Sequence, residues 1–488
     1  MAQSTPPGSQ YIFFAPGLKV NVVTTTDGSN LPPPVSGQFN LELVTQPVGT
    51  NYPLPTGYQG VAILPGGTGS ALQVLIGDLT IVDTASGDTI TLGSGAQTVI
   101  GATGDVITGG PGSALINAIA GSELVTAGSG AMTIWGGAGD TIFGASGSGA
   151  STIVGAAGDT ITGGLGGDLI NAVTGPQSVT GGSGATTIWG GAGDTITGGA
   201  GSALIDGTLG NQLITGGPGA STILGGAGDT IIGSTGSGSS TIIGAKGNSI
   251  KAGTGSDLIN ALAGSETITG GGGSLTVWGG SGDMIFGGTG KNLIVGAAGD
   301  TISGGAGSST ILGSAGSQKI SGSEVGAFTV PGLGIVIPQF GACTIVGGAG
   351  DTITAGAGSD LINALAGNQS VTGGKGNAKP GVGSATVWAG GGGDTIASGG
   401  GKLTVDIDHI TFPGAERIGD NGIAGSTSVR GFSQSDGDRI FFPNETQAAI
   451  DSIIASAKTS GGDTLITFPD GGTLTLIGIT SIDSTFFG

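Results

Sequence analysis

Short apolar triplets recur along the chain from about residue 80, and each has an isoleucine or valine at its centre. Successive centres are 8 or 9 residues apart, with two steps of 11. The series starts at Ile81, Ile90 and Val99 and runs to Ile320. Because side chains alternate between the two faces of a strand, each triplet predicts a three-residue strand with its centre inward and its neighbours outward.

Glycine-rich turns such as GGAGD, GGPG and GGSG separate the triplets. Glycine accepts the positive φ that such turns need, so the chain reverses at each of them. Two strands and two turns make one coil of 17 to 19 residues, and stacked coils bury the inward column that a single coil leaves exposed. The pattern therefore predicts an all-β fold: a right-handed parallel β-roll, or β-solenoid, with small β-rich segments at both ends.

Breaks in the repeat predict the domain limits. Residues 1–70 form a proline-rich, β-like segment, residues 71–400 form the β-roll, and residues 401–488 form a β-rich C-terminal cap. Two insertions interrupt the roll, at 321–341 and 375–383. Insertions in a solenoid map to protruding loops, so we expect both to project from the coils.

The composition narrows the function classes. The 488 residues include 112 glycines, only 9 % are charged, and 32 acids against 12 bases give a net charge of −20. This balance excludes a nucleic-acid binder, which needs a basic footprint. Cys343 is the only cysteine, which excludes a disulfide framework. We expect no membrane span and no N-terminal secretory signal, because neither a long apolar window nor a basic leader is seen.

The type of residue found two positions before each centre differs between the two sides of the roll. On one side it is always an acid or an amide. This acid–amide column comprises Asp88, Asp105, Glu123, Asp140, Asp159, Gln177, Asp194, Gln212, Asp229, Asn248, Glu266, Asp283, Asp300, Gln318, Asp351, Gln369 and Asp394. Coils about 4.8 Å apart would crowd these carboxylates, so bound cations or the intervening amides must relieve their repulsion. Alternatively, the same residue types simply cap glycine turns. The residues alone leave both interpretations open.

Two rows of outward residues differ in chemistry. One, the tryptophan row, is largely apolar and contains all four tryptophans of the chain, Trp135, Trp189, Trp278 and Trp388. The opposite row is mostly threonine. A soluble monomer rarely exposes so long an apolar row. We therefore expect that a terminal segment covers it or that a homo-oligomer, filament or lattice assembles through it.

One turn, GGLGGDLIN at 163–171, fits the nonapeptide GGxGxDxUx at every fixed position. AGTGSDLIN (252–260), AGAGSDLIN (355–363) and AGGGGDTIA (389–397) miss only the first glycine. These turns resemble the repeats of hemolysin-type calcium-binding (RTX) proteins, over roughly residues 80–400. The resemblance implies Ca²⁺ between successive coils, an ion that suits oxygen ligands.

The resemblance carries Asp168, Asp257, Asp360 and Asp394 over as candidate calcium ligands. Most turns of this chain, however, are GGAGD, one residue shorter than the family turn, which implies few or altered calcium sites. The neighbouring acids that lie in such short turns are further candidate metal ligands: Asp88, Asp105, Glu123, Asp140, Asp159, Glu266, Asp283 and Asp300.

The C-terminal stretches GFSQSDGDRIFF, GGDTLITFPDGGTLTLIGI and DSTFFG resemble the C-terminal region of type I secreted proteins. That resemblance implies an uncleaved export signal, recognition by the type I export machinery, and a secreted, extracellular or cell-surface location. The same stretch also serves as a β-rich cap over the last coil, because a solenoid end needs covering.

We predict no enzymatic activity and no catalytic residue. His409 is the only histidine and lies in an alternating DIDHITF pattern, which predicts a strand residue. The leading hypothesis is a calcium-stabilised, secreted structural protein that self-assembles, such as a surface-layer, matrix or filament subunit or an adhesin stalk. The alternative is an ice- or glycan-binding solenoid, suggested by Thr-x-Thr pairs such as Thr160 with Thr162 and Thr195 with Thr197.

Overall fold

The computed structural model is nearly all β, with 43 % of residues in strands and 4 % in helices, and its parallel sheets form a β-solenoid, which confirms the predicted fold class. The residues that it describes are 19–26, 31–44, 56–63, 71–73, 79–313, 315–323, 325–329, 336–374, 383–422 and 424–488. The chain divides into two compact units, Met1–Leu224 and Gly225–Gly488.

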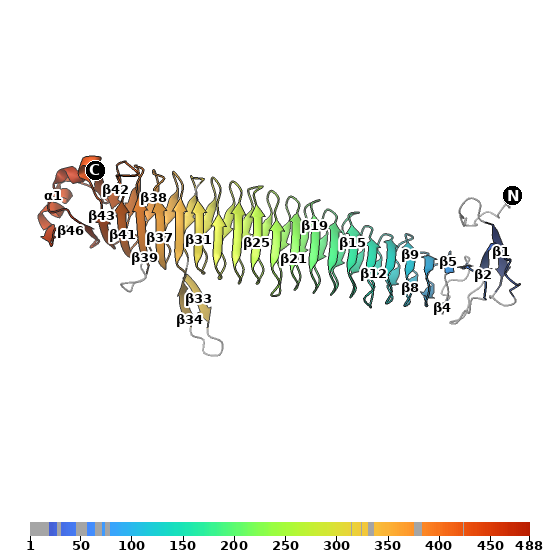
Figure 1. Ribbon diagram of the computed structural model, residues 1–488. Coiled ribbons are helices and arrows are strands. Elements are labelled where there is room, and N and C mark those ends of the chain that lie inside the picture. The colour runs from blue at the N-terminus through green and yellow to red at the C-terminus, as the bar shows by residue number, and fades with distance from the viewer. Residues whose placement is uncertain are drawn as a thin grey trace. The chain divides into compact units, whose positions relative to one another are not determined.

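After three strands that lie in one sheet, successive strands of the first unit alternate between two parallel sheets (Figure 1). One sheet contains β1 (Val20–Thr25), β2 (Phe39–Val44), β3 (Gly60–Ile63), β5 (Leu79–Asp83), β7 (Gln97–Ile100), β9 (Ala114–Ala118), β11 (Met132–Gly136), β13 (Ser151–Val154), β15 (Asp168–Ala172), β17 (Thr186–Gly190) and β19 (Ala203–Gly207). The other contains β4 (Ala71–Gln73), β6 (Thr89–Thr91), β8 (Val106–Thr108), β10 (Leu124–Thr126), β12 (Thr141–Phe143), β14 (Thr160–Thr162), β16 (Ser178–Thr180), β18 (Thr195–Thr197) and β20 (Leu213–Thr215). Strand β21 (Ser221–Gly225) includes the limit between the units.

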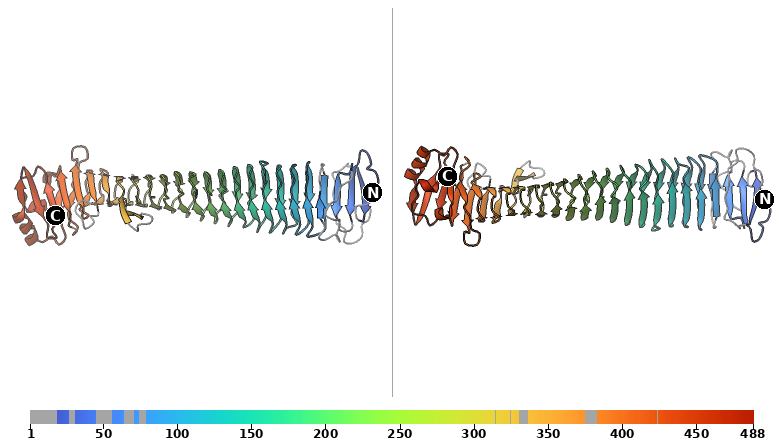
Figure 2. Two further views of the ribbon diagram at one scale, coloured as in Figure 1. Left: turned by 90° about the horizontal axis from the view of Figure 1, so that it is seen from below. Right: turned by 90° about the horizontal axis from the view of Figure 1, so that it is seen from above.

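The second unit shows the same alternation as far as residue 441, apart from one inserted hairpin, and its last three strands lie in the first sheet (Figure 2). Its first sheet contains β23 (Ser240–Ile243), β25 (Asp257–Ala261), β27 (Leu275–Gly279), β29 (Asn292–Val295), β31 (Ser309–Gly313), β35 (Cys343–Gly347), β37 (Ser359–Ala364), β39 (Ser384–Ala389), β41 (Lys402–Ile407), β43 (Ser426–Arg430), β45 (Lys458–Ser460), β46 (Asp463–Thr467) and β47 (Thr473–Leu476). Its second sheet contains β22 (Thr230–Ile232), β24 (Ser249–Lys251), β26 (Thr267–Thr269), β28 (Met284–Phe286), β30 (Thr301–Ser303), β32 (Lys319–Ser321), β36 (Thr352–Thr354), β38 (Ser370–Thr372), β40 (Thr395–Ala397), β42 (Arg417–Gly419) and β44 (Arg439–Phe441).

The core of each unit is the inward isoleucine and valine column that the triplets predict. Ile134 of β11, for example, pairs in register with Ile116 of β9 and Ile153 of β13. All three side chains are fully buried, as are the equivalent centres along both sheets. Burying one such side chain stabilises the fold by about 1.5–3 kcal/mol, so a thin core suffices when it is repeated in every coil.

Glycine is required where the turns of successive coils approach each other closely. A Cβ added at Gly182 would lie 1.8 Å from the carbonyl oxygen of Gly164, and one at Gly199 would lie 1.6 Å from that of Gly182. The atoms that such a Cβ would meet belong to the backbone, which cannot move aside as the end of a flexible side chain can. The high glycine content therefore follows from the coil spacing at these turns as well as from turn conformation.

The insertion at 321–341 forms the hairpin of β33 (Val325–Thr329) and β34 (Val336–Phe340), which pair antiparallel. The roll continues around it, because β32 pairs in parallel with β36, the next strand of its sheet. Figure 1 shows the hairpin projecting from the second unit, as predicted for an insertion. Of the predicted insertion at 375–383, residues 375–382 lie outside the described residues.

Parallel pairing also runs past both predicted limits of the β-roll. At the N-terminal end β1, β2, β3 and β5 pair in parallel order, and at the C-terminal end β39, β41, β43 and β47 do so. Helix α1 (Gln447–Ser456) and the short 3-10 helix η2 (Ser484–Phe486) follow β44, the last strand of the second sheet, along the chain. The three-domain division stays a prediction.

Candidate functional site

The acid–amide column is buried rather than exposed at an edge. Every one of its members is at most 5 % exposed. The column therefore places carboxylates directly beside the isoleucine core, where each needs hydrogen-bond donors to compensate for the loss of water.

Backbone amides supply those donors, and Asp140 shows the arrangement. Its Oδ2 accepts a hydrogen bond from the amide of Gly137 in its own turn at 2.8 Å. Its Oδ1 accepts one from the amide of Glu123, the preceding member of the column, also at 2.8 Å. One carboxylate thus closes its own turn and joins it to the neighbouring coil, because it has two oxygens in a fixed geometry.

The same pair of bonds recurs along the column in both units. Asp105, Asp159, Asp194, Asp283, Asp300 and Asp351 each accept from an amide of their own turn and from the previous column member, at 2.6–2.9 Å. On the opposite side of the roll, Asp168, Asp257 and Asp360 accept in the same way from the amides of Ser151, Ser240 and Cys343. Together these bonds form a carboxylate ladder that fixes the stacking of the coils.

Amides and acids are interchangeable in this column where only one acceptor is needed. Oδ1 of Asn248 accepts from the amide of Asp229 at 3.0 Å. Gln177 and Gln212 reach further and donate through Nε2 to the carbonyl oxygens of Ala172 and Gly207, at 2.8 and 3.0 Å. The shared property of the column is therefore hydrogen bonding, not charge.

Glu123 and Glu266 stand in the column at positions like those of Gln177 and Gln212, and their ionised forms destabilise the fold. Burial, followed by the charge of the neighbouring Asp140, raises the pKa of Glu123 to about 8. Burial and the charge of Asp283 raise the pKa of Glu266 to about 8. Oε1 of each glutamate has no hydrogen-bond partner among the described residues. Both side chains are consequently stabilised when protonated.

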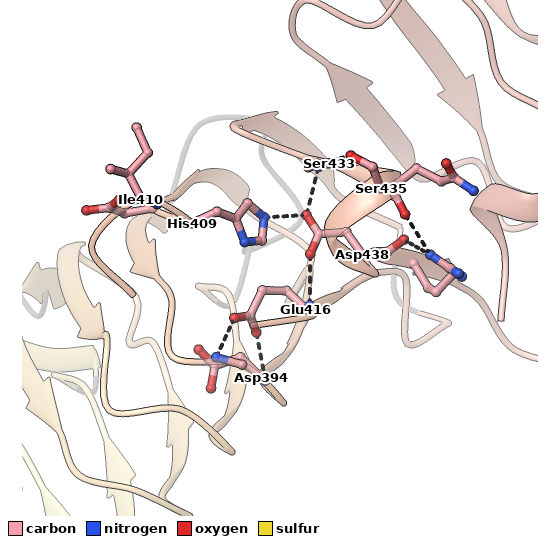
Figure 3. Close-up of polar contacts among 11 residues, drawn as sticks. Asp394, His409, Ile410, Glu416, Ser433, Ser435 and Asp438 are labelled. Atoms are coloured by element: carbon pink, nitrogen blue, oxygen red, sulfur yellow. Dashed lines mark hydrogen bonds and ion pairs between the residues drawn. The ribbon is translucent and has the colours of Figure 1, made fainter. Parts of the chain in front are cut away.

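A second set of polar contacts extends the ladder toward the C-terminal end (Figure 3). Glu416 accepts from the amides of Asp394 and Gly392, and Asp438 accepts from the amides of Glu416 and Ser433. Nε2 of His409 lies 2.9 Å from Oδ2 of Asp438. Sequence reasoning missed Glu416 and Asp438, although each stands two positions before a strand centre, Ile418 and Ile440, as the ladder acids do.

The prediction that His409 is a strand residue is wrong. Strand β41 ends at Ile407, and His409 lies in the following turn. There Asp408 caps the turn, since its Oδ1 accepts from the amides of Ile410 and Thr411. This Asx turn breaks the alternation that the sequence pattern suggested. Cys343, by contrast, is a buried free thiol at the start of β35, and burial raises its pKa to about 12.

The ladder does not resemble a preassembled calcium cage. Ca²⁺ takes six to eight oxygen ligands, whereas the oxygens of these carboxylates accept from backbone amides. No group of three or more His, Cys, Asp or Glu side chains that could hold a metal occurs among the described residues. That Asp168, Asp257, Asp360, Asp394 and the short-turn acids bind calcium stays a prediction.

The tryptophan row is exposed in both units. Trp135 and Trp189 of the first unit and Trp278 and Trp388 of the second are each 40–44 % exposed. Each tryptophan is the register partner of an outward asparagine on the preceding strand, at 117, 171, 260 and 363. The opposite, threonine-rich row is interrupted by Phe143 and Phe286, which are similarly exposed. Within the described part of the chain, no helix is long and apolar enough to cross a membrane.

Comparison with known proteins links this architecture to a family of repeats. The model of the RTX calcium-binding nonapeptide repeat, in four copies, matches residues 118–150, 206–239, 234–274, 278–300, 296–323 and 344–378. Neither the comparison with curated proteins nor that with solved structures gives a match.

Proposed function

We propose that this RTX-like repeat protein is a secreted structural protein that calcium stabilises and that self-assembles through its tryptophan row. It would serve outside the cell as a surface-layer, matrix or filament subunit or as an adhesin stalk. The type I export machinery would deliver it through its C-terminal region. The repeat family supports calcium and secretion, and the proposal assigns no catalytic role to any residue.

The exposed tryptophans carry the assembly part of this proposal. An indole is a large apolar surface, and two per unit are held outward on a parallel sheet at the same register position. Burying such side chains between copies removes apolar area from water at about 25 cal/mol per Å². Aromatic residues are also the usual anchors of protein interfaces.

We expect that replacing the four tryptophans with serine weakens self-association at least tenfold. Sedimentation velocity over a concentration series, and electron microscopy of concentrated protein with calcium, would measure it. The matched control replaces Phe143 and Phe286, which are equally exposed on the threonine-rich row. Monomers at every concentration of the unaltered chain, or equal losses in both variants, would contradict assembly through this row.

Calcium is expected to raise the melting temperature without being needed for the fold. The continuous core and the amide-bonded ladder hold the coils together, so β-sheet circular dichroism should persist in chelator. Each calcium site would add about 2.7 kcal/mol at a hundredfold excess over its dissociation constant. Melting with chelator, millimolar calcium and millimolar magnesium would test this.

The combined variant D168N, D257N and D360N should lose most of the calcium response, and D206N, an acid of the tryptophan row, should keep it. An unaltered melting temperature in calcium would leave these carboxylates as turn acceptors only. Complete unfolding in chelator would show instead that the ion is essential for the fold.

A further inference from the structure

The second unit contains an open pocket of about 650 Å³ at the end of the tryptophan row. Trp388, Leu365 and Ile407 line it with apolar surface. Asp406, Asp408, Asp436, His409 and Ser433 add polar groups. Ligand pockets of proteins have this size and this mixture of an apolar wall with a few convergent polar groups.

Two of the carboxylates are available to a ligand. Asp406 and Asp436 make no side-chain hydrogen bond or ion pair in the described part of the chain. Asp406 is the register partner of Trp388, so its carboxylate stands beside the indole on the outward face. Hydrogen bonds from Thr411 and Ile410 lower the pKa of Asp408, which keeps that side chain ionised at neutral pH.

His409 adds a further acceptor. Nε2 of its ring lies 2.9 Å from Oδ2 of Asp438, which accepts a hydrogen bond when Nε2 carries the hydrogen of the neutral ring. Nδ1 is buried and has no hydrogen-bond partner among the described residues. A neutral imidazole whose Nε2 carries the hydrogen has an acceptor lone pair on Nδ1, and leaving that lone pair unpaired is unfavourable.

Apart from the hydroxyl of Ser433, the polar side chains of this pocket are acceptors, and no lysine or arginine lines it. Arg430, the register partner of Asp406 on β43, forms no ion pair with it. A ligand that satisfies these groups must bring N–H donors and positive charge, together with an apolar stem for the indole. Cations are attracted to the face of tryptophan, and more strongly where water is partly excluded.

We propose that this pocket binds a protonated alkylamine or guanidinium group. The cation would lie between the Trp388 face and the carboxylates of Asp406 and Asp436, with its stem against Leu365. Such a cation has two possible sources. One is a lysine or arginine side chain of a polypeptide, and the other is a free small amine or guanidine. The proposal does not rest on calcium, since it uses none of the ladder residues as ligands, and Trp388 is the residue that it shares with the proposed assembly surface.

The test uses the full chain labelled with 5-fluorotryptophan, in which substitution of each tryptophan assigns one ¹⁹F resonance. Titration with butylguanidinium should shift the Trp388 resonance saturably, and butylurea, its neutral isostere, should bind at least tenfold more weakly. Single D406N and D436N variants should each weaken binding about three- to fivefold, because exposed ion pairs contribute modestly. The other three resonances report that each variant is folded.

The first unit provides a matched control. Trp189 and Asp206 form the same register pair as Trp388 and Asp406, without the additional carboxylates of the pocket. D206N should leave the Trp388 titration unchanged. Equal shifts of Trp189 and Trp388, equal binding of butylurea, or no effect of D406N with D436N would overturn the proposal.

A second titration distinguishes the two sources. Acetyl-Gly-Arg-Gly-amide binding more tightly than butylguanidinium would identify a polypeptide ligand. Butylamine or butylguanidinium binding as tightly as the peptide would identify a free small cation. Either result supports a cation site. A Trp388 shift with calcium alone, at the same midpoint as with the organic cations and without the isostere preference, would overturn it.

Discussion

Replacing Asp283 with alanine is expected to lower the free energy of unfolding by about 2–5 kcal/mol. The substitution removes the acceptor of two buried amides, those of Gly280 in the same turn and Glu266 in the preceding coil. Each orphaned amide costs about 1–3 kcal/mol because the site is shielded from water. Urea unfolding followed by circular dichroism and by tryptophan fluorescence, to which Trp278 contributes close before Asp283 in the chain, would measure the loss.

The asparagine variant of the same residue should lose less, about 1 kcal/mol, because one acceptor oxygen remains. Asn248 already occupies an equivalent position and accepts from the amide of Asp229. As a surface control, D470N should change stability by less than about 0.5 kcal/mol. Equal effects of alanine and asparagine at position 283, or no effect of either, would show that the ladder does not bind the coils together.

The regular parts of the fold follow from the sequence because they depend on local alternation. A centre such as Ile134 is flanked by outward residues and bounded by glycine turns, so its inward direction is determined within a few positions. Stacking then follows, since one coil cannot bury its own face. Alternation does not determine the Asx turn at Asp408, which depends on side-chain hydrogen bonds to the backbone, and there the alternating pattern wrongly predicted a strand.

The burial of the acid–amide column was not predicted, because polar residues at the ends of turns are ordinarily exposed. The signal that points to burial is the substitution of amides for acids within the column itself. Gln177, Asn248 and Glu266 share positions with aspartates, and what the four residue types have in common is a side-chain acceptor oxygen. A column maintained for its charge would not alternate with neutral amides. The pocket beside Trp388 could not be predicted, because it depends on how the turn after β41 meets residues 431–436.

The stability of the protein is expected to fall as the pH rises from about 6 to 9, in calcium-free buffer. The folded-state pKa values of Glu123 and Glu266 are about 8, because burial and neighbouring aspartates disfavour their ionised forms. An unfolded glutamate ionises near pH 4.3. Both groups therefore contribute their full stabilising effect below the unfolded pKa, and this contribution is lost as the pH rises through the folded pKa. Salt-bridged carboxylates give the opposite trend.

Glutamine at both positions should remove much of this pH dependence. The E123Q and E266Q variant replaces each glutamate with the residue that the column carries at Gln177 and Gln212, whose Nε2 donates to a backbone carbonyl. At pH 9 each substitution should raise the free energy of unfolding by about 1–3 kcal/mol, because it replaces a buried, partly unpaired charge with a neutral donor and acceptor. Near pH 5, where the glutamates are protonated in the folded protein, the variant and the unaltered chain should differ little. Urea midpoints at four pH values would establish the two slopes, with D470N as the exposed-carboxylate control. Parallel slopes for both proteins would place the pH dependence elsewhere in the ladder, and stability rising toward pH 9 would contradict protonated glutamates in the core.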